Sequence, residues 1–148
     1  MLLTLDQAWQ LALLAVTAFA SATILPGSSE IAMVAALKAG SAPLAWVLTA
    51  ATFGNVGGSC LNFWLGLHAR RFQDRRWFPF TPDSLDRATT RFQRYGLITL
   101  LFSWLPVIGD PLTFIAGVLR VPVLAFVTLV AIGKLMRYVL LAGAVTGL

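Results

Sequence analysis

Apolar runs separated by proline and glycine breaks organise the first part of the chain. The run from Trp9 to Leu25 predicts a helix that stops at Pro26-Gly27, because proline lacks an amide donor and glycine favours a non-helical turn. A short apolar piece, Ile31 to Ala39, follows. At about 1.5 Å per residue it is too short to cross a hydrocarbon core of about 30 Å. Residues from about 8 to 39 therefore predict a re-entrant helical hairpin.

The next apolar run covers about residues 44–67 and is long enough to span a membrane. It contains small residues that let neighbouring helix backbones approach closely, namely Gly54, Gly57, Gly58, Ser59 and Gly66. We expect this helix to be a packing spine. Asn55 and Asn62 lie on one face of it, where hydrogen bonding between helices is the default interpretation and a role in lining a pathway stays open.

A polar segment over residues 69–94 follows the first span. Its basic residues are Arg70, Arg71, Arg75, Arg76, Arg87, Arg91 and Arg94. Such a cluster beside apolar spans is typical of a cytoplasmic loop. Thr81 to Ser84 predicts a helix start, and Phe92 lies on an apolar side opposite Arg87 and Arg91, so we expect a basic amphipathic helix on the cytoplasmic membrane surface. A solvated helix that binds nothing is the alternative. The aromatic residues expected to anchor its entry at the interface are Trp77, Phe78 and Phe80.

The second half of the chain repeats this plan. Short apolar pieces on both sides of Pro106 and Gly109, the later one starting at Leu112, predict a second hairpin over about residues 95–120. The following run is long enough to cross the membrane, with an expected span over about residues 121–147.

The two halves together predict an inverted repeat. With the basic segment in the cytoplasm, the span from Leu44 runs inward and the span from Val121 runs outward. Residues 1–68 and 95–148 then form two inverted repeats within a single membrane domain, a plan in which broken helices meet near the bilayer midplane and build a substrate site. The side of the membrane on which the N-terminus lies stays open, because a full crossing by residues 9–25 would reverse the orientation of the first hairpin.

Composition fixes the class of protein. Hydrophobic residues make up 58% of the 148 residues and charged residues 11%, against roughly 25% charged in soluble domains. We therefore expect an all-α integral membrane protein. The net charge of +5 has its basic residues concentrated in the 69–94 segment, so nucleic acid is not an expected partner. Asp6 and the lack of Lys or Arg over residues 1–10 argue against a signal peptide, and the single cysteine, Cys60, excludes an internal disulfide.

Two carboxylates lie in otherwise apolar sequence: Glu30 is four residues after Pro26, and Asp110 is four residues after Pro106. Acids at membrane depth are costly, so they usually face a bundle interior or a watery cavity, where they contact substrate, protons or each other. Helix capping is the alternative. Asp110, followed by Pro111, suits an N-cap, and Glu30 suits the dipole of a first helical turn.

Cations in the last span are the expected partners of these acids. Lys134 and Arg137 lie three apart on one helix face, roughly midway along the span. Ion pairs with the two acids have the lowest free-energy cost of burying these charges. They also offer a place where an anionic headgroup or a proton exchanges. Lys38 and Arg120 lie near hairpin ends and are either interface anchors or headgroup contacts.

The sequence shows no catalytic constellation, so we do not expect an enzyme. Ser28 and Ser29 lack a Gly-x-Ser-x-Gly context, and His68 lies far away at a membrane boundary. Capping or backbone contact is the better interpretation of both serines. No metal, nucleotide or phosphate-loop signature is present, and no cofactor is expected.

Several short motifs are distributed along nearly the whole chain. They are Ser21 to Gly27 with Glu30, Gly54-Asn55 with Gly57-Gly58, Arg94-Tyr95-Gly96, Ser103 to Asp110, Ala116-Gly117, Arg120, and Gly133-Lys134 with Arg137-Tyr138. In combination they resemble the DedA family of membrane proteins, also described as the SNARE-associated or VTT domain, and specifically its short YqaA-like branch. The resemblance implies two re-entrant hairpins facing each other and an activity in lipid movement or proton-coupled transport. Family members typically carry arginines flanking the second-hairpin proline, where this chain has Ser103 and Gly109. We expect Lys134 and Arg137 to supply that charge from another helix.

The leading hypothesis is a bacterial inner-membrane transporter or lipid flippase that moves an anionic lipid or a proton-coupled solute through a midplane site between the hairpins. The rival is a non-transporting structural or assembly factor whose buried charges stabilise the hairpins. The substrate- or proton-binding residues are expected to be Glu30, Asp110, Lys134, Arg137 and Arg120. Supporting roles are expected for Pro26, Gly27, Asn55, Pro106 and Gly109. Membrane lipids are the expected partners, and a homo-oligomer stays open.

Overall fold

The structure of the chain is a computed structural model that describes residues 3–23, 27–71, 81–105 and 108–147. All regular elements in these residues are helical, which agrees with the expected all-α class. The elements are α1 (Leu5–Ser21), α2 (Ser28–Lys38), α3 (Leu44–Leu67), η1 (Ala69–Arg71), α4 (Pro82–Tyr95), η2 (Leu97–Trp104), α5 (Gly109–Val118) and α6 (Val123–Thr146).

Helix α1 begins earlier than the apolar run predicts because of its cap. The Thr4 side chain accepts a hydrogen bond from the Gln7 amide at 3.3 Å, and the Thr4 amide donates to Gln7 Oε1 at 3.1 Å. This reciprocal arrangement is a capping box, which satisfies donors that a helix start leaves free. The cap therefore starts the helix at Leu5, four residues before the expected Trp9.

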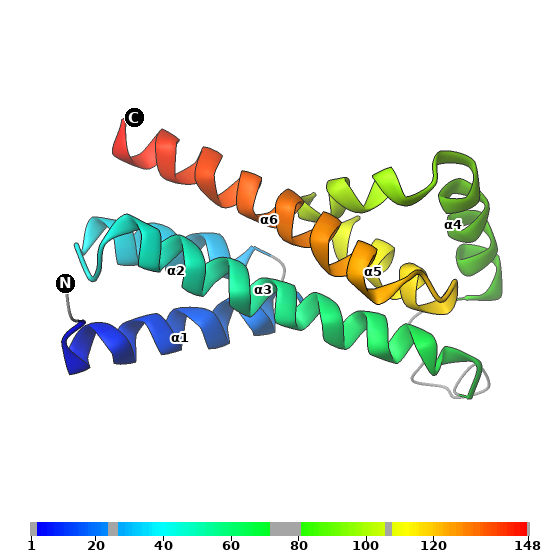
Figure 1. Cartoon of the computed structure of the whole chain (residues 1–148), viewed down its shortest axis with the longest axis horizontal. Coiled ribbons are helices and arrows are strands. Elements are labelled where there is room, and N and C mark those ends of the chain that lie inside the picture. Colours follow the sequence, from blue (N-terminus) through cyan, green and yellow to red (C-terminus); the bar gives the residue numbers. More distant parts are fainter. Residues whose placement is uncertain (1–2, 24–26, 72–80, 106–107, 148) are drawn as a thin grey trace.

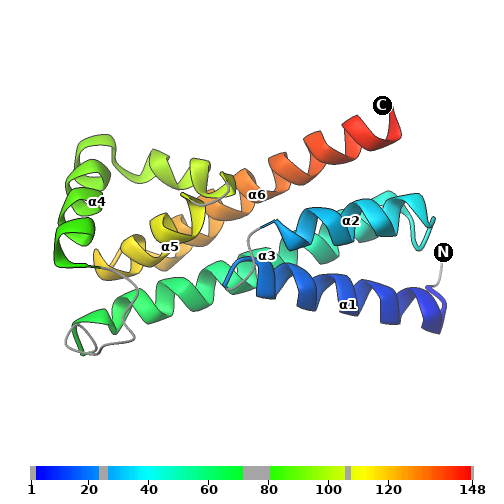
Figure 2. The same ribbon diagram turned by 180° about the vertical axis from the view of Figure 1, so that it is seen from behind.

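Helix α2 begins at Ser28, directly after Gly27, whose φ of 90° places it in the left-handed region. This start is three residues before the expected Ile31. It places Glu30 within the first turn of the helix. The helix has 11 residues and a length of about 16 Å, which is too short to cross a bilayer. It packs against α1 and α3, beside which it lies in both Figure 1 and Figure 2.

Two helices, α3 and α6, are long and apolar enough to cross a membrane, with 24 residues each. They run antiparallel, since the N-terminal part of α3 and the C-terminal part of α6 enter the same apolar cluster. That cluster also holds residues of α1 and α2; its buried members are Leu11, Leu14, Met33, Val47, Ala51, Tyr138 and Ala142. The termini of the chain lie at this end of the molecule (Figure 1).

A second apolar cluster occupies the other end and joins α3, α4, η2, α5 and α6. Its largest buried members are Phe63, Phe92, Leu100, Phe114, Ile115 and Phe126. On each long helix, polar residues lie between the parts that enter the two clusters: Asn55 and Ser59 on α3, and Lys134 on α6. The molecule therefore has a polar layer between two apolar clusters.

The expected close packing along α3 is present. A Cβ atom on Gly54 would overlap the backbone of Ala15 in α1. Near the other end, Cβ atoms on Gly66 of α3 and Gly117 of α5 would each overlap the backbone of the opposite helix. Small residues at these positions therefore let α1 and α5 pack directly on the backbone of α3.

Helix α4 carries the expected charged face, with Arg87, Arg91 and Arg94 exposed, while Phe92 is buried in the second cluster. Its contact with a membrane surface stays a prediction. The aromatic residues expected at its entry, Trp77, Phe78 and Phe80, lie outside the described residues.

The second half differs from expectation in detail. The apolar piece after α4 forms a 3₁₀ helix, η2, and α5 begins at Gly109 instead of Leu112. Two helical pieces followed by a 24-residue helix thus occur twice in the order of elements, although α1, with 17 residues, is longer than α2, η2 and α5. The re-entrant character of these pairs and their inverted relation stay predictions.

Candidate functional site

The polar layer contains two acid–cation pairs that both involve α6. Lys134 Nζ lies 3.8 Å from Asp110 Oδ1, and Arg137 forms an ion pair with Glu30. Lys134 is the more deeply buried cation, with a side chain 5% exposed against 17% for Arg137. The structure thus brings together four of the five residues that the sequence suggested for binding.

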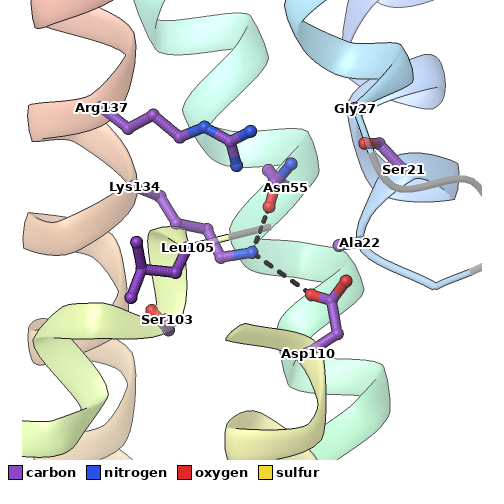
Figure 3. Close-up of a pocket in the computed structure, with 9 residues that line it drawn as sticks. All are labelled: Ser21, Ala22, Gly27, Asn55, Ser103, Leu105, Asp110, Lys134 and Arg137. Carbon is purple, nitrogen blue, oxygen red and sulfur yellow. Dashed lines mark hydrogen bonds and ion pairs between the residues drawn. The ribbon is translucent and has the colours of Figure 1, made fainter. Parts of the chain in front are cut away.

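Local structure explains how these four side chains meet. Lys134 and Arg137 are three residues apart on a regular helix, so they project from one face of α6. Figure 3 shows both directed from α6 toward α3 and α5. Glu30 and Asp110 lie in the first turns of the short helices α2 and α5. Each short helix thereby places one carboxylate beside the middle of α6.

Asn55 connects the site to three other elements. Its side-chain oxygen accepts a hydrogen bond from Lys134 Nζ, and its Nδ2 donates to Tyr138 OH at 2.9 Å and to Ser29 Oγ at 3.4 Å. Ser21 Oγ donates to Ser29 Oγ at 3.2 Å. The network therefore links α1, α2, α3 and α6 through one buried amide.

A small cavity lies among these groups. It has a volume of about 20 Å³ and is lined by residues that include Gly27, Asn55, Ser103, Asp110 and Lys134 (Figure 3). A space of this size holds about one water molecule. Ser103 is 2% exposed, and its hydroxyl oxygen has no hydrogen-bond partner among the described residues. The cavity therefore combines charged groups with one unsatisfied hydroxyl.

The interpretation of Asp110 as an N-cap is wrong. Helix α5 begins at Gly109, its N-cap residue is Ile108, and no side chain caps it. Asp110 lies one residue inside the helix, and its carboxylate pairs with Lys134. Thr113 Oγ1 donates to the backbone carbonyl of Asp110 at 2.7 Å. A first-turn acid still suits the helix dipole, but the ion pair orients the side chain.

Capping does not account for Ser29 either. The N-cap of α2 is Gly27, without a side-chain cap hydrogen bond, and the Ser29 hydroxyl belongs to the Asn55 network. Asn62 donates from Nδ2 to the Ala22 carbonyl at 2.8 Å. The expected hydrogen bonding between helices is thus confirmed for both asparagines, with Asn55 in the charged site.

The structure places the remaining predicted residues elsewhere. Arg120 is exposed in the turn between α5 and α6 and does not join the four-charge site. Lys38 is exposed in the last turn of α2. Gly109 is buried, and a Cβ atom there would overlap the Ser103 carbonyl. Pro26 and Pro106 lie outside the described residues.

Sequence reasoning named Tyr138 and Ser21 only as parts of the family motifs and assigned neither residue to the site. Tyr138 lies four residues after Lys134, and this spacing places both side chains on one helix face, so helical periodicity was an available signal. Ser21 ends an apolar helix and offered no comparable signal. The described residues hold no group of three or more His, Cys, Asp or Glu side chains arranged to bind a metal ion.

The described residues form helices, two of these helices are of membrane length, and four charged side chains meet beside the middle of α6, which are features typical of a membrane protein. The family model of the VTT domain matches residues 25–147, so the chain belongs to the VTT-domain, or DedA, family. It is 42% identical over 146 residues to the inner membrane protein YqaA of Escherichia coli K12 and of Shigella flexneri, an alignment covering 95% of this chain and 94% of each relative.

The chain is also 38% identical over 145 residues to an uncharacterized protein of Haemophilus influenzae, with 91% of this chain and 87% of that protein covered. No solved structure gave a significant match. The relatives named as inner membrane proteins support the inner membrane as the location of this family member.

Proposed function

We propose that this protein is a transporter or lipid flippase that moves an anionic lipid or a proton-coupled solute through the site between the two pairs of short helices. One observation carries the proposal: Asp110, Lys134 and Arg137 line a cavity midway along the long helices, and Glu30 of α2 forms an ion pair with Arg137 beside it. Charged groups at membrane depth are expensive and usually belong to substrate or ion pathways.

The charges of the site suit the exchange of a proton or an anionic headgroup. Two acids balance two cations, so an anionic headgroup that binds a cation while the displaced carboxylate takes up a proton leaves no isolated charge. The cavity of about 20 Å³ has room for about one water molecule, and a headgroup needs more space. Under this proposal, α2 and α5 move apart from α6 when the substrate enters.

The proposal includes an inverted repeat with two re-entrant hairpins. Helices α2 and α5 have 11 and 10 residues, too few to cross a bilayer, and the two long helices run antiparallel. The N-terminus, the turn between α2 and α3, and the C-terminus lie at one end of the molecule, while α4 lies at the other (Figure 1). This arrangement supports a cytoplasmic 69–94 segment with both chain ends on the outer side.

Cysteine accessibility tests this topology. Single cysteines at positions 6, 41, 84 and 148, in a Cys60→Ala background, are labelled in intact cells with a membrane-impermeant maleimide. We expect labelling at 6, 41 and 148 and protection at 84. Labelling at 84 in intact cells contradicts the cytoplasmic position of α4, and protection at 6 with labelling at 41 contradicts the first hairpin.

A reconstituted lipid-translocation assay tests the function. Glu30→Gln and Asp110→Asn keep the shape of each side chain and remove its charge, and Asp86→Asn on the exposed face of α4 is the matched control. We expect the first two variants to lose most of the movement of short-chain fluorescent phosphatidylglycerol between leaflets, and the control to retain it. Undiminished movement by both folded site variants removes these carboxylates from the mechanism.

The rival function is a structural or assembly factor, and the same ion pairs favour it because they fasten α2 and α5 to α6. It predicts that Glu30→Gln and Asp110→Asn lower the thermal stability of the protein while the wild type moves no lipid. Measuring unfolding and translocation on the same preparations separates the two functions.

A further inference from the structure

A second cavity lies at the end of the molecule opposite the termini. It has a volume of about 280 Å³ and is lined by Gly66, Leu67, His68, Arg71, Val118 and Arg120. These residues come from the end of α3, from η1, and from the end of α5 and the turn that follows it. This end of the molecule also carries α4 (Figure 1). Because the basic segment is expected in the cytoplasm, the cavity lies at the cytoplasmic boundary of the membrane.

The base of this cavity is held by direct backbone packing. A Cβ atom on Gly66 would overlap the backbone of Phe114 and approach that of Val118, and a Cβ atom on Gly117 would overlap the backbone of Phe63. Helices α3 and α5 therefore meet here without intervening side chains. The two basic residues beside the cavity follow this helix pair in the chain, Arg71 in η1 and Arg120 in the turn after α5.

Arg120 has a backbone conformation that arginine rarely adopts. Its φ is 53°, and it is the residue other than glycine with positive φ among those described. The Arg120 amide donates to the Gly117 carbonyl at 2.9 Å and the Val121 amide to the Ala116 carbonyl at 3.0 Å. This pattern is a Schellman motif, in which the left-handed position is usually occupied by glycine.

Helix α2 ends in the same motif with the usual residue. The Gly40 amide donates to the Leu37 carbonyl and the Ser41 amide to the Ala36 carbonyl, both at 3.1 Å, and Gly40 has a φ of 62°. At the matching point of α5 the chain has Arg120, although a side chain is disfavoured there. The helix dipole stabilises an arginine near a helix C-terminus. An arginine within the last turn would gain the same stabilisation without adopting a positive φ.

Among the described residues, the cations of the cavity have no acidic partner. Neither the Arg71 nor the Arg120 side chain makes a hydrogen bond or ion pair with another described residue. None of the residues lining the cavity is acidic. The His68 ring is fixed on one side, since Nδ1 lies 2.8 Å from the Trp64 carbonyl and the two rings are 4.6 Å apart. Two guanidinium groups therefore border an open space, and no acidic side chain of the described residues pairs with them.

We infer that this cavity binds a phosphate group, with Arg71 and Arg120 as its ligands, on a phospholipid headgroup of the cytoplasmic leaflet or as free phosphate. Arginine pairs with phosphate through two parallel hydrogen bonds, and basic pockets between membrane helices on the cytoplasmic side bind anionic headgroups. The site is separate from the four-charge site midway along α6. The inference does not rest on the transport function and stands if that function fails.

The variant Arg120→Gly provides a sharp test, because it removes the cation and restores the usual residue of a Schellman motif. We expect its thermal midpoint to equal or exceed that of the wild type, so weaker binding cannot be attributed to unfolding. Arg71→Gln is the second variant, and Arg91→Gln, on the exposed face of α4, is the control with the same loss of charge.

The full chain in neutral detergent is titrated with dioctanoyl phosphatidylglycerol, dioctanoyl phosphatidylcholine and inorganic phosphate, and binding is followed by native mass spectrometry for the lipids and calorimetry for phosphate. We expect Arg120→Gly and Arg71→Gln each to weaken binding about tenfold, and Arg91→Gln to leave it nearly unchanged. Binding of phosphatidylglycerol in preference to phosphatidylcholine identifies a lipid ligand, and binding of inorganic phosphate alone identifies a free one. The inference is overturned if neither anion binds, or if Arg91→Gln weakens binding as much as the two site variants.

Discussion

Lys134 Nζ lies 3.8 Å from Asp110 Oδ1, and the lysine side chain is 5% exposed whereas the carboxylate is 32% exposed. Both side chains border the small cavity, and the cation is the more deeply buried of the two. Asn55 also binds Lys134, so the lysine has a neutral partner that remains if Asp110 changes its position or its protonation. This asymmetry makes Asp110 the more exchangeable member of the pair.

Replacement of Lys134 by methionine tests the stability that this pair provides. Lys134→Met leaves Asp110 without a cation and Asn55 without one donor, and breaking a fully buried pair costs about 3 to 5 kcal/mol. Because the Asp110 carboxylate is 32% exposed, we expect a smaller loss of about 2 to 3 kcal/mol in the free energy of unfolding, measured in detergent.

The double variant Lys134→Met with Asp110→Asn is expected to recover part of that loss, because it no longer leaves a charge unpaired. Lys38→Met, at the exposed end of α2, is the control and should change stability by less than about 0.5 kcal/mol. Equal stability of Lys134→Met and Lys38→Met would show that the pair does not hold the fold.

Glycines on α3 provide a test of the helix packing. Both Gly54→Ala and Gly57→Ala gain the same helix propensity. An added methyl group at Gly54 meets the backbone of Ala15, whereas at Gly57 it comes 3.3 Å from the Phe19 side chain, which can move. We expect Gly54→Ala to be less stable than Gly57→Ala by about 1 to 3 kcal/mol in thermal unfolding. Equal midpoints would contradict the close approach of α1 and α3.

The hydroxyl of Tyr138 is expected to stabilise the fold through its hydrogen bond with Asn55. Tyr138→Phe removes the acceptor of the 2.9 Å hydrogen bond from Asn55 Nδ2 and leaves a buried donor with only the longer contact to Ser29. We expect a loss of about 1 kcal/mol in unfolding free energy. Tyr95→Phe, at an exposed tyrosine on α4, is the matched control. A loss of the same size in the control would mean that the measurement does not report on this hydrogen bond.

Ser103 is expected to behave differently from other buried serines. Its hydroxyl has no partner among the described residues, so Ser103→Ala removes an unsatisfied polar group and should leave stability unchanged or raise it by up to about 1 kcal/mol. Ser59→Ala removes a hydrogen bond to the Asn55 carbonyl and should lower stability by about 1 kcal/mol. If Ser103→Ala is the more damaging change, the hydroxyl has a partner in the cavity, for which a bound water is the natural candidate.

Local sequence signals predicted the order of the helices but misplaced several boundaries. The capping box at Thr4 and the left-handed Gly27 start α1 and α2 earlier than hydrophobicity alone indicates. The alternative interpretation of Asp110 as an N-cap, which rested on the following proline, is wrong, because the helix begins one residue earlier and the carboxylate has an ion partner. Short-range patterns fix that a helix forms, and the competition between a cap and a distant partner is decided by packing.

The sequence by itself determined the membrane class, the two long helices and the four charged residues that had to find partners, because burial of an unpaired charge in an apolar protein is too costly. Only the tertiary structure decided that Lys134 binds Asp110 while Arg137 binds Glu30, and that Arg120 lies at another cavity. These outcomes depend on the rotation and crossing of helices far apart in the chain. Their contacts are set by backbone packing at positions such as Gly54 and Gly66 rather than by any local pattern.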